Sequence, residues 1–340
     1  MRTYLPALCS LAMLASVGCR SVTKNEPLPA DTAAVHEPSE PAPPAVVEFN
    51  SNGALVAKDR DIYYLRSLTR RFDVVERTWA TLPSPRTTGR IHLGAGVAGE
   101  HILSIGGTAS LRDTDVIEVL DTRSRTWERR GRLPEPLSMM ATVASADGKV
   151  YLFGGRRVLD ARLRSYDTES VNTVYVIEDE GRSVRRLADM PTPRQLAAAV
   201  VVGADIWVLG GSIARANVDR AQPPATSVVE IFHPETNTWR EGPAMPKSSE
   251  GHAVHLDGTL VFFGDGPLWP KEPMLLDIQA GSWQLGARRD TKTIGSVIAG
   301  AVVIDDTIHV MSGVIPGGLQ PKEAHICTYD PDKDAWQVLQ

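Results

Sequence analysis

Basic side chains recur in the proline-flanked and loop-like segments of this chain. Guanidinium groups bind carboxylates through paired hydrogen bonds, so arginines gathered on one surface can receive an anionic sugar, a peptidoglycan fragment or an acidic protein segment. Trp269 lies between Pro267 and Pro270 and offers an aromatic face on which a sugar ring can stack. The candidate binding residues are Arg86, Arg90, Arg156, Arg157, Arg194, Lys247, Trp269 and Arg288.

A plainer interpretation of the same residues stays open. The arginines can form a solvated rim in which they pair with nearby acids such as Asp160, Asp167 and Asp219. Trp269 can equally pack its own loop against the rest of the fold. Under this interpretation neither group contacts a ligand.

The histidines and cysteines form no pattern typical of a metal site or a catalytic site. His252 and His255 are three residues apart, which places them on opposite faces of a strand, so they cannot bind one metal ion together. Cys327 has no partner in a mature chain, because Cys9 and Cys19 belong to the N-terminal segment. We therefore expect no metal, no cofactor and no intramolecular disulfide, and we assign no catalytic residue.

A sixfold repeat must position these side chains. Each unit has a short apolar strand that runs into glycine, as at residues 102–107, 150–155 and 206–211. A second strand follows, and in five of six units an acid comes directly after its last apolar residue. A Trp position lies seven residues after that last apolar residue. The Trp position is held by Trp79, Trp127, Val184, Trp239, Trp283 and Trp336. From Trp79 to Trp336 the five steps average about 51 residues.

The double glycine and the later Trp resemble the kelch repeat, whose units form β-propeller blades of four antiparallel strands. The segments are short, β-branched or aromatic, and are interrupted by Gly, Pro and Asp, which favours strands over helices. The resemblance implies an all-β, six-bladed kelch-type β-propeller over residues 46–340. We expect each blade to be one contiguous segment, the first beginning near Ala54, and residues 46–49 to form an additional edge strand.

The N-terminal segment predicts export and a membrane anchor. Residues 1–18 have an early Arg2 and a short apolar run, and end in small residues before Cys19, which resembles the lipobox of bacterial lipoproteins. Cys19 would then be lipidated, and the Pro-rich residues 19–45 would form an extended tether. A plain secretory signal with an incidental cysteine is the alternative.

Composition limits the function classes further. The chain has 340 residues, 42% apolar residues and a net charge of −5, values that exclude general disorder, a membrane-embedded body and a basic nucleic-acid-binding surface. We expect a monomeric propeller, lipid-anchored in the bacterial cell envelope at the outer membrane, that binds an envelope protein or an anionic glycan without catalysis. The alternatives are a carbohydrate-active enzyme resembling the exported sialic-acid epimerases (mutarotases) and a structural subunit of a larger envelope complex.

Overall fold

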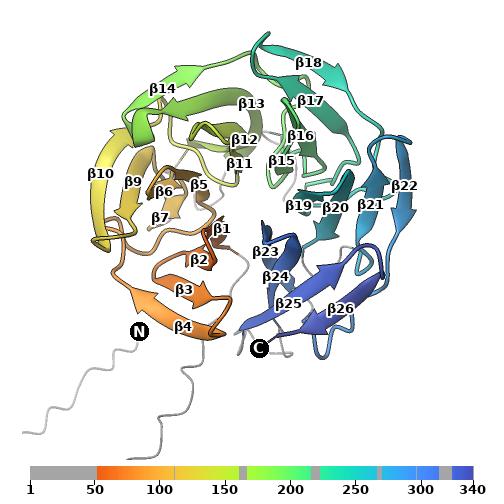
Figure 1. Ribbon diagram of the computed structural model, residues 1–340. Helices are drawn as coiled ribbons and strands as arrows, with labels where there is room; N and C mark the ends of the chain where they lie inside the picture. The colour runs from red at the N-terminus through yellow and green to blue at the C-terminus, as the bar shows by residue number, and fades with distance from the viewer. Residues whose placement is uncertain are drawn as a thin grey trace, which may run out of the picture. The chain divides into compact units, whose positions relative to one another are not determined.

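Six four-stranded antiparallel sheets surround a central channel in the computed structural model (Figure 1). The structure describes residues 52–110, 112–160, 167–215, 223–265, 270–295, 297–313 and 324–339. Residues 46–49, Cys19 and the rest of the N-terminal segment lie outside the described residues, as does Trp269. The predicted six-bladed β-propeller is confirmed.

The strands of each blade follow one another from the channel outward. Blade 1 contains β1 (Ala54–Lys58), β2 (Asp61–Leu65), β3 (Thr69–Asp73) and β4 (Thr78–Leu82). Blade 2 contains β5 (Gly94–Ala98), β6 (His101–Ile105), β9 (Val116–Asp121) and β10 (Thr126–Arg132), with a small hairpin of β7 (Thr108–Ala109) and β8 (Arg112–Asp113) inserted. Blade 3 contains β11 (Ala141–Ala144), β12 (Val150–Asp160), β13 (Asp167–Glu178) and β14 (Ser183–Arg186), with the 3-10 turn η1 (Asp179–Gly181) before β14.

The second half repeats this order. Blade 4 contains β15 (Ala198–Val202), β16 (Asp205–Leu209), β17 (Val229–His233) and β18 (Thr238–Glu241). Blade 5 contains β19 (Gly251–Leu256), β20 (Thr259–Gly264), β21 (Met274–Asp277) and β22 (Ser282–Leu285). Blade 6 contains β23 (Val297–Ile304), β24 (Thr307–Gly313), β25 (Ala324–Asp330) and β26 (Ala335–Val338). Each blade is therefore one contiguous segment, as the sequence predicted.

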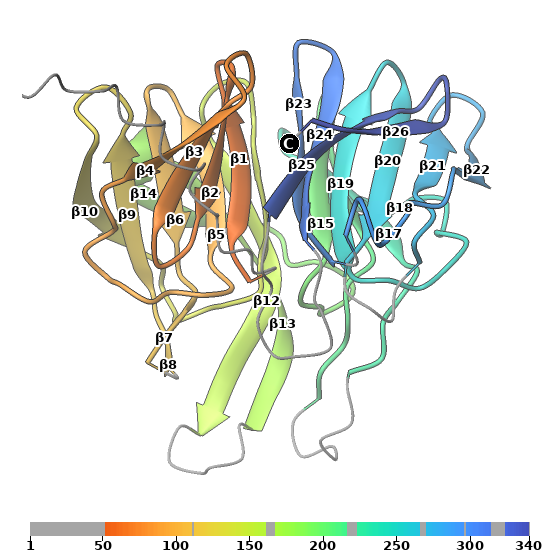
Figure 2. The same cartoon turned by 90° about the horizontal axis from the view of Figure 1, so that it is seen from below.

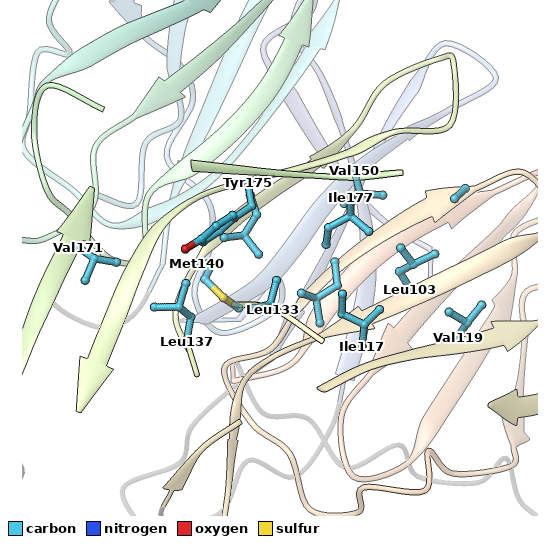
Figure 3. Packing of buried hydrophobic residues seen from close by; sticks show 13 residues of the cluster. Leu103, Ile117, Val119, Leu133, Leu137, Met140, Val150, Val171, Tyr175 and Ile177 are labelled. Carbon is cyan, nitrogen blue, oxygen red and sulfur yellow. The ribbon is translucent and has the colours of Figure 1, made fainter. Parts of the chain in front are cut away.

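Successive side chains of each strand alternate between two neighbouring blades, and this alternation explains how the blades pack. In β2, Ile62 and Tyr64 face blade 6, whereas Tyr63 and Leu65 face blade 2, because successive side chains of a strand point to opposite faces. An apolar cluster of this kind fills every junction between neighbouring blades; Figure 3 shows the one between blades 2 and 3. Each fully buried large side chain contributes about 1.5–3 kcal/mol to stability.

Among the described residues, blades 1 and 6 meet through side chains, and no sheet contains strands of both blades. Blades 1 and 6 are joined by an apolar cluster that includes Phe72 and Met311. Arg60 Nε also lies 2.8 Å from a carboxylate oxygen of Asp305 across this junction. The first and last blades are thus held together by packing and an exposed ion pair.

The acid that follows each second apolar strand caps a turn. The Asp73 carboxylate accepts hydrogen bonds from the backbone N–H groups of Val75 and Glu76, both at 3.0 Å, and Asp121 and Asp330 make the same pair of bonds in their blades. A side-chain oxygen that satisfies two backbone donors stabilises a tight turn. These turns therefore form the same way in blades 1, 2 and 6.

Two kinds of connection share one face of the ring, which we call the loop face. They are the links between blades and the connections between the second and third strands of each blade. Figure 2 shows that the β7–β8 hairpin and the extended ends of β12 and β13 project from this face. The tight turns that join first to second strands lie at the opposite face, the turn face.

Candidate functional site

Four Trp residues of the repeat fasten their blades to the preceding ones. The indole N–H of Trp127 donates to the Pro83 carbonyl at 2.8 Å, and that of Trp239 donates to the Ala188 carbonyl at 3.0 Å. Trp283 and Trp336 make the equivalent bonds at 3.0 Å. An indole that buries its ring and donates its N–H across a junction has a structural role. These residues are therefore not part of the candidate site.

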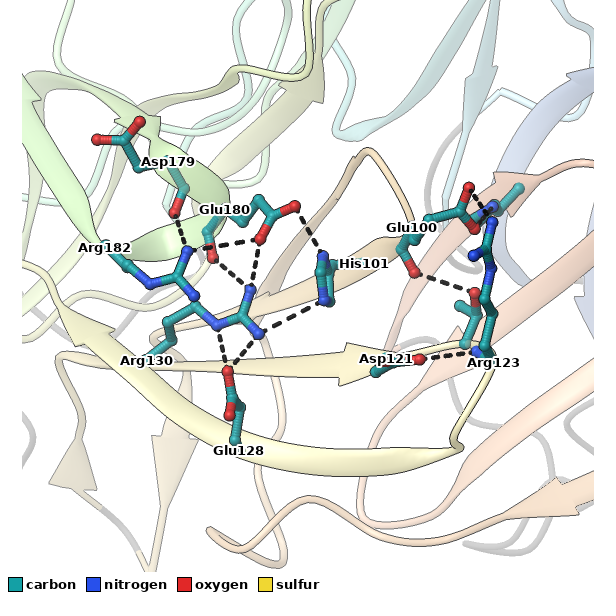
Figure 4. A network of polar contacts seen from close by, with 11 residues as sticks. Glu100, His101, Asp121, Arg123, Glu128, Arg130, Asp179, Glu180 and Arg182 are labelled. Atoms are coloured by element: carbon teal, nitrogen blue, oxygen red, sulfur yellow. Dashed lines mark hydrogen bonds and ion pairs between the residues drawn. The ribbon is translucent and has the colours of Figure 1, made fainter.

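Blade 3 has Val184 in the Trp position and uses an ionic contact at the same junction instead. Arg130 of β10 is largely buried and lies 2.9 Å from Glu180, which belongs to η1 in blade 3, and it also pairs with Glu128 (Figure 4). Glu180 in turn lies 3.0 Å from Nδ1 of His101 in β6. The Arg130 guanidinium thus joins blade 2 to blade 3 at the junction where Val184 offers no indole N–H donor.

The predicted ligand-binding role of Arg90 is not supported by its position. Its side chain has no exposed surface, and its guanidinium lies 2.6 Å from the Glu118 carboxylate. It also donates to the Ser104 hydroxyl at 2.8 Å and to the carbonyls of Gly106 and Val116 at 3.1 and 3.2 Å. Burial lowers the pKa of Arg90, and the charge of Glu118 opposes this effect. A fully enclosed guanidinium cannot meet a ligand.

Arg194 repeats this arrangement in blade 4, so it too is removed from the predicted binding surface. It is fully buried, lies 2.6 Å from Glu230 and donates to the Val228 carbonyl at 2.8 Å. The sequence did contain a signal for both pairs. Glu118 and Glu230 each stand between two apolar residues inside a strand, and a buried acid of this kind requires a cationic partner.

Arg156 and Arg157 lie at the base of the β12–β13 extension. Arg156 is half-buried and pairs with Asp113 at 3.0 Å, so it ties blade 3 to the β7–β8 hairpin of blade 2. Arg157 is exposed and pairs with Glu135 at 3.2 Å and with Glu169. These two arginines therefore have acidic partners within the fold, whereas the side chains of Asp160, Asp167 and Asp219 lie outside the described residues.

The remaining basic candidates lie elsewhere on the loop face. Arg86 is exposed on the link between blades 1 and 2. Lys247 and Arg288 lie on the links before and after blade 5, and each is 3.6 Å from a carboxylate oxygen of Glu272. The candidate arginines therefore do not converge on one pocket, which favours an extended partner over a small ligand.

Hollows open among the loop-face elements that the structure describes, and three of them concern the candidate site. One lies at the channel, has a volume of about 190 Å³ and is lined by Asn52, His92, Leu196 and Glu250 among others. Two grooves of about 550 and 370 Å³ flank the base of the β12–β13 extension. Both grooves include Glu169, Ser170 and Pro193, so they adjoin one another at these residues.

The channel hollow is bordered by a belt of backbone hydrogen bonds. The N–H groups of His92, Met139 and Leu196 each donate to a carbonyl of the preceding blade, at 2.7, 2.9 and 2.8 Å. The same three residues have positive φ values of 53°, 58° and 53°. This left-handed conformation, which is costly for residues other than Gly, recurs where three links enter their inner strands, and is therefore a feature of the fold.

The histidines near the channel are uncharged at neutral pH. Burial lowers the pKa of His92 and of His252 to about 4. Burial likewise raises the pKa of the Cys327 thiol to about 11. Within the described ranges, no three His, Cys, Asp or Glu residues are grouped closely enough to hold a metal ion.

Comparisons with known proteins agree with the repeat. A family model described as "KLHDC2/KLHL20/DRC7 Kelch-repeats domain" matches residues 92–313. Kelch repeat and BTB domain-containing protein 12 of Danio rerio is 26% identical over 243 residues, which is 67% of this chain and 37% of that protein. Beta-scruin of Limulus polyphemus is 27% identical over 176 residues, which is 50% of this chain and 18% of that protein. This chain thus spans less than half the length of these two relatives.

A solved structure titled "Structure of YjhT" has the same fold. It superposes with a TM-score of 0.68 at 13% identity and covers 88% of this chain and 99% of that one. The similarity at this level of identity concerns the fold alone. From the six repeated blades and the family match over residues 92–313, the chain belongs to the kelch-repeat family of β-propeller proteins.

Proposed function

We propose that this protein is a non-catalytic binding module of the bacterial cell envelope, lipid-anchored through Cys19 at the outer membrane. Its loop face would contact an envelope protein or an anionic glycan. The kelch-propeller fold, which is typical of protein-binding modules, supports the proposal at the level of the family.

The observation that carries the proposal is the pair of adjoining grooves at the base of the β12–β13 extension. One groove is lined by Pro134 and Glu135 among others, and the other by Ile213 and Arg215. Their walls mix proline, exposed arginine and carboxylates, a composition typical of the polar rim of a protein interface. Loops held on a rigid scaffold are where binding surfaces form.

A substitution in the groove tests this proposal. Arg215→Glu changes an exposed groove residue, and Arg123→Glu, on the turn face, is the matched control. In affinity capture of the full chain from envelope extracts, with glycan binding measured on an array, we expect a partner that Arg215→Glu loses and Arg123→Glu keeps. No partner in either assay, or equal retention by both variants, would contradict the proposal.

The anchor has a separate test. No helix within the part of the chain that the structure describes is long and apolar enough to cross a bilayer. If Cys19 carries the lipid, Cys19→Ser moves the protein from the membrane fraction to the soluble periplasmic fraction. Retention in the membrane fraction by Cys19→Ser would contradict lipid anchoring through this residue.

The alternative, an enzyme acting on an anionic sugar, has less support. The channel hollow of about 190 Å³ is smaller than the ~300–1,000 Å³ of a ligand pocket. Accelerated anomer exchange of fresh α-N-acetylneuraminate, followed by NMR with the purified chain, would favour the enzyme over the binding module.

A further inference from the structure

Blade 5 gathers basic side chains from three separate segments of the loop face. Lys247 comes from the link that enters the blade, Lys271 from the connection between β20 and β21, and Arg288 and Arg289 from the link that leaves it. The backbone N–H of Arg289 donates to the Lys271 carbonyl at 3.2 Å, so two of these segments are hydrogen-bonded together. We call these four residues the blade 5 cation cluster.

Two of the cations share one carboxylate at the surface. Lys247 Nζ and Arg288 Nη1 lie 3.6 Å from different oxygens of Glu272. Both side chains remain substantially exposed, at 43% and 70% of their surface. The pKa of Glu272 is lowered, first by a hydrogen bond with its own backbone and then by these two cations, so it is ionised at neutral pH. Each pair is a loose ion pair that leaves N–H donors directed to solvent.

The other two cations lie deeper. Arg289 is 2% exposed, and its guanidinium donates to the carbonyls of Gly264 and Gly295 at 3.2 and 3.3 Å. Burial, with the nearby positive charges of Arg289 and Arg288, lowers the pKa of Lys271 to about 8. Lys271 therefore lies in a positive local field, even though Asp265 and Glu272 are close by.

The charges of the cluster do not cancel. Four cations face Glu272 and Asp265, which leaves an excess of positive charge on one part of an otherwise acidic protein. An anion that enters the cluster relieves the repulsion that acts on Lys271, and binding is favourable for that reason. The exposed donors of Lys247 and Arg288 can contact it directly.

We propose that the blade 5 cation cluster binds carboxylates of an acidic polypeptide segment. This inference rests on the proposed function, because it specifies how a partner of the loop face is recognised. A polypeptide fits because Lys247 and Arg288 are exposed and already share the side-chain carboxylate of Glu272, so Asp or Glu side chains of a partner chain can meet their remaining N–H donors in the same way. Such rim charges raise the association rate and select for partners of opposite charge.

The test uses a synthetic hexaglutamate peptide and the full chain, so it needs no natural partner. Lys271→Gln and Arg288→Gln each remove one charge, and Lys149→Gln, on the turn face, is the control, since Lys149 pairs there with Asp147 at 2.6 Å. Fluorescence anisotropy at low salt should show binding that each cluster variant weakens about two- to fivefold and the control leaves unchanged. Circular dichroism confirms that the variants are folded.

A second readout follows Lys271 itself. Bound carboxylates raise the pKa of Lys271 above its value of about 8, so peptide should slow the reaction of its amine with an acylating reagent near pH 8. Unchanged Lys271 reactivity, absence of peptide binding, or equal weakening by Lys149→Gln would overturn the cluster as a binding site. Preferential binding of oligogalacturonate through the same residues would overturn the polypeptide as its ligand. None of these outcomes decides whether the groove residues bind a partner, which Arg215→Glu tests separately.

Discussion

Substitution of Arg194 by Met tests whether this arginine stabilises the fold or binds a ligand. The change keeps an unbranched side chain of similar length but removes the charge-assisted bond to Glu230 at 2.6 Å and the bond to the Val228 carbonyl at 2.8 Å. Glu230 is 3% exposed and would retain the Thr192 hydroxyl, at 2.7 Å, as a neutral donor. Arg194→Met therefore leaves a carboxylate enclosed without a counter-charge.

The expected cost is large. Removing one partner of a buried ion pair costs about 3–5 kcal/mol, because the remaining charge is desolvated and unpaired. For a domain of this size each kcal/mol lowers Tm by about 1–2 °C, which gives a decrease of about 3–10 °C. Arg86→Met, which changes an exposed arginine on an equivalent link, should alter Tm by less than about 2 °C.

Thermal unfolding followed by circular dichroism measures the difference. The double variant Arg194→Met with Glu230→Leu, which removes both charges, should recover a substantial part of the lost stability. An Arg194→Met variant with an unchanged Tm but weakened partner binding would refute the structural role and restore Arg194 to the binding surface.

The remaining predictions concern junctions and pH. Trp239→Phe keeps an aromatic ring but removes the N–H bond to Ala188 together with part of the packed indole, so we expect a loss of at least about 1 kcal/mol in urea unfolding, and no loss would contradict the fastening role of the indole. Arg130→Met should cost about 1–3 kcal/mol at the junction that has Val184, whereas the exposed Arg129→Met should cost almost nothing; equal costs would remove the ionic contact from the account. His92 and His252 have folded-state pKa values of about 4, below the ordinary value of 6.5, so the unfolded chain binds more protons between these values. Stability should therefore be insensitive to these groups above pH 6.5 and fall by about 1–3 kcal/mol per histidine as the pH drops to 4; a His252→Gln variant with the same pH dependence would contradict this assignment.

The repeat could be predicted from the sequence because its elements are local. A glycine pair, an acid at a turn and a Trp seven residues after an apolar position each occupy a few neighbouring residues, and their order defines a blade. Gly107, for example, has a φ of 91°, and a Cβ there would approach the Ile91 carbonyl oxygen to 2.8 Å. The identity of such a residue is dictated by its own backbone, so the pattern alone indicates it.

The roles of individual arginines depend on contacts distant in sequence. Arg90 and Arg156 both belong to loop-face segments, yet one is enclosed with Glu118 and the other pairs with Asp113 of the adjacent blade. Position in the repeat determines the face on which a residue lies but not the direction of its side chain. The ionic contact that accompanies Val184 was missed for the same reason, since it joins Arg130 to Glu180 across two blades.

Site-specific photocrosslinking in cells tests the central claim most directly. A photoreactive amino acid at Arg215, in the groove of the loop face, is compared with one at Arg123 on the turn face. The account predicts discrete protein or glycan adducts from position 215 and none from position 123. Adducts from position 123 alone, or none from either position, would contradict a binding module that acts through its loop face.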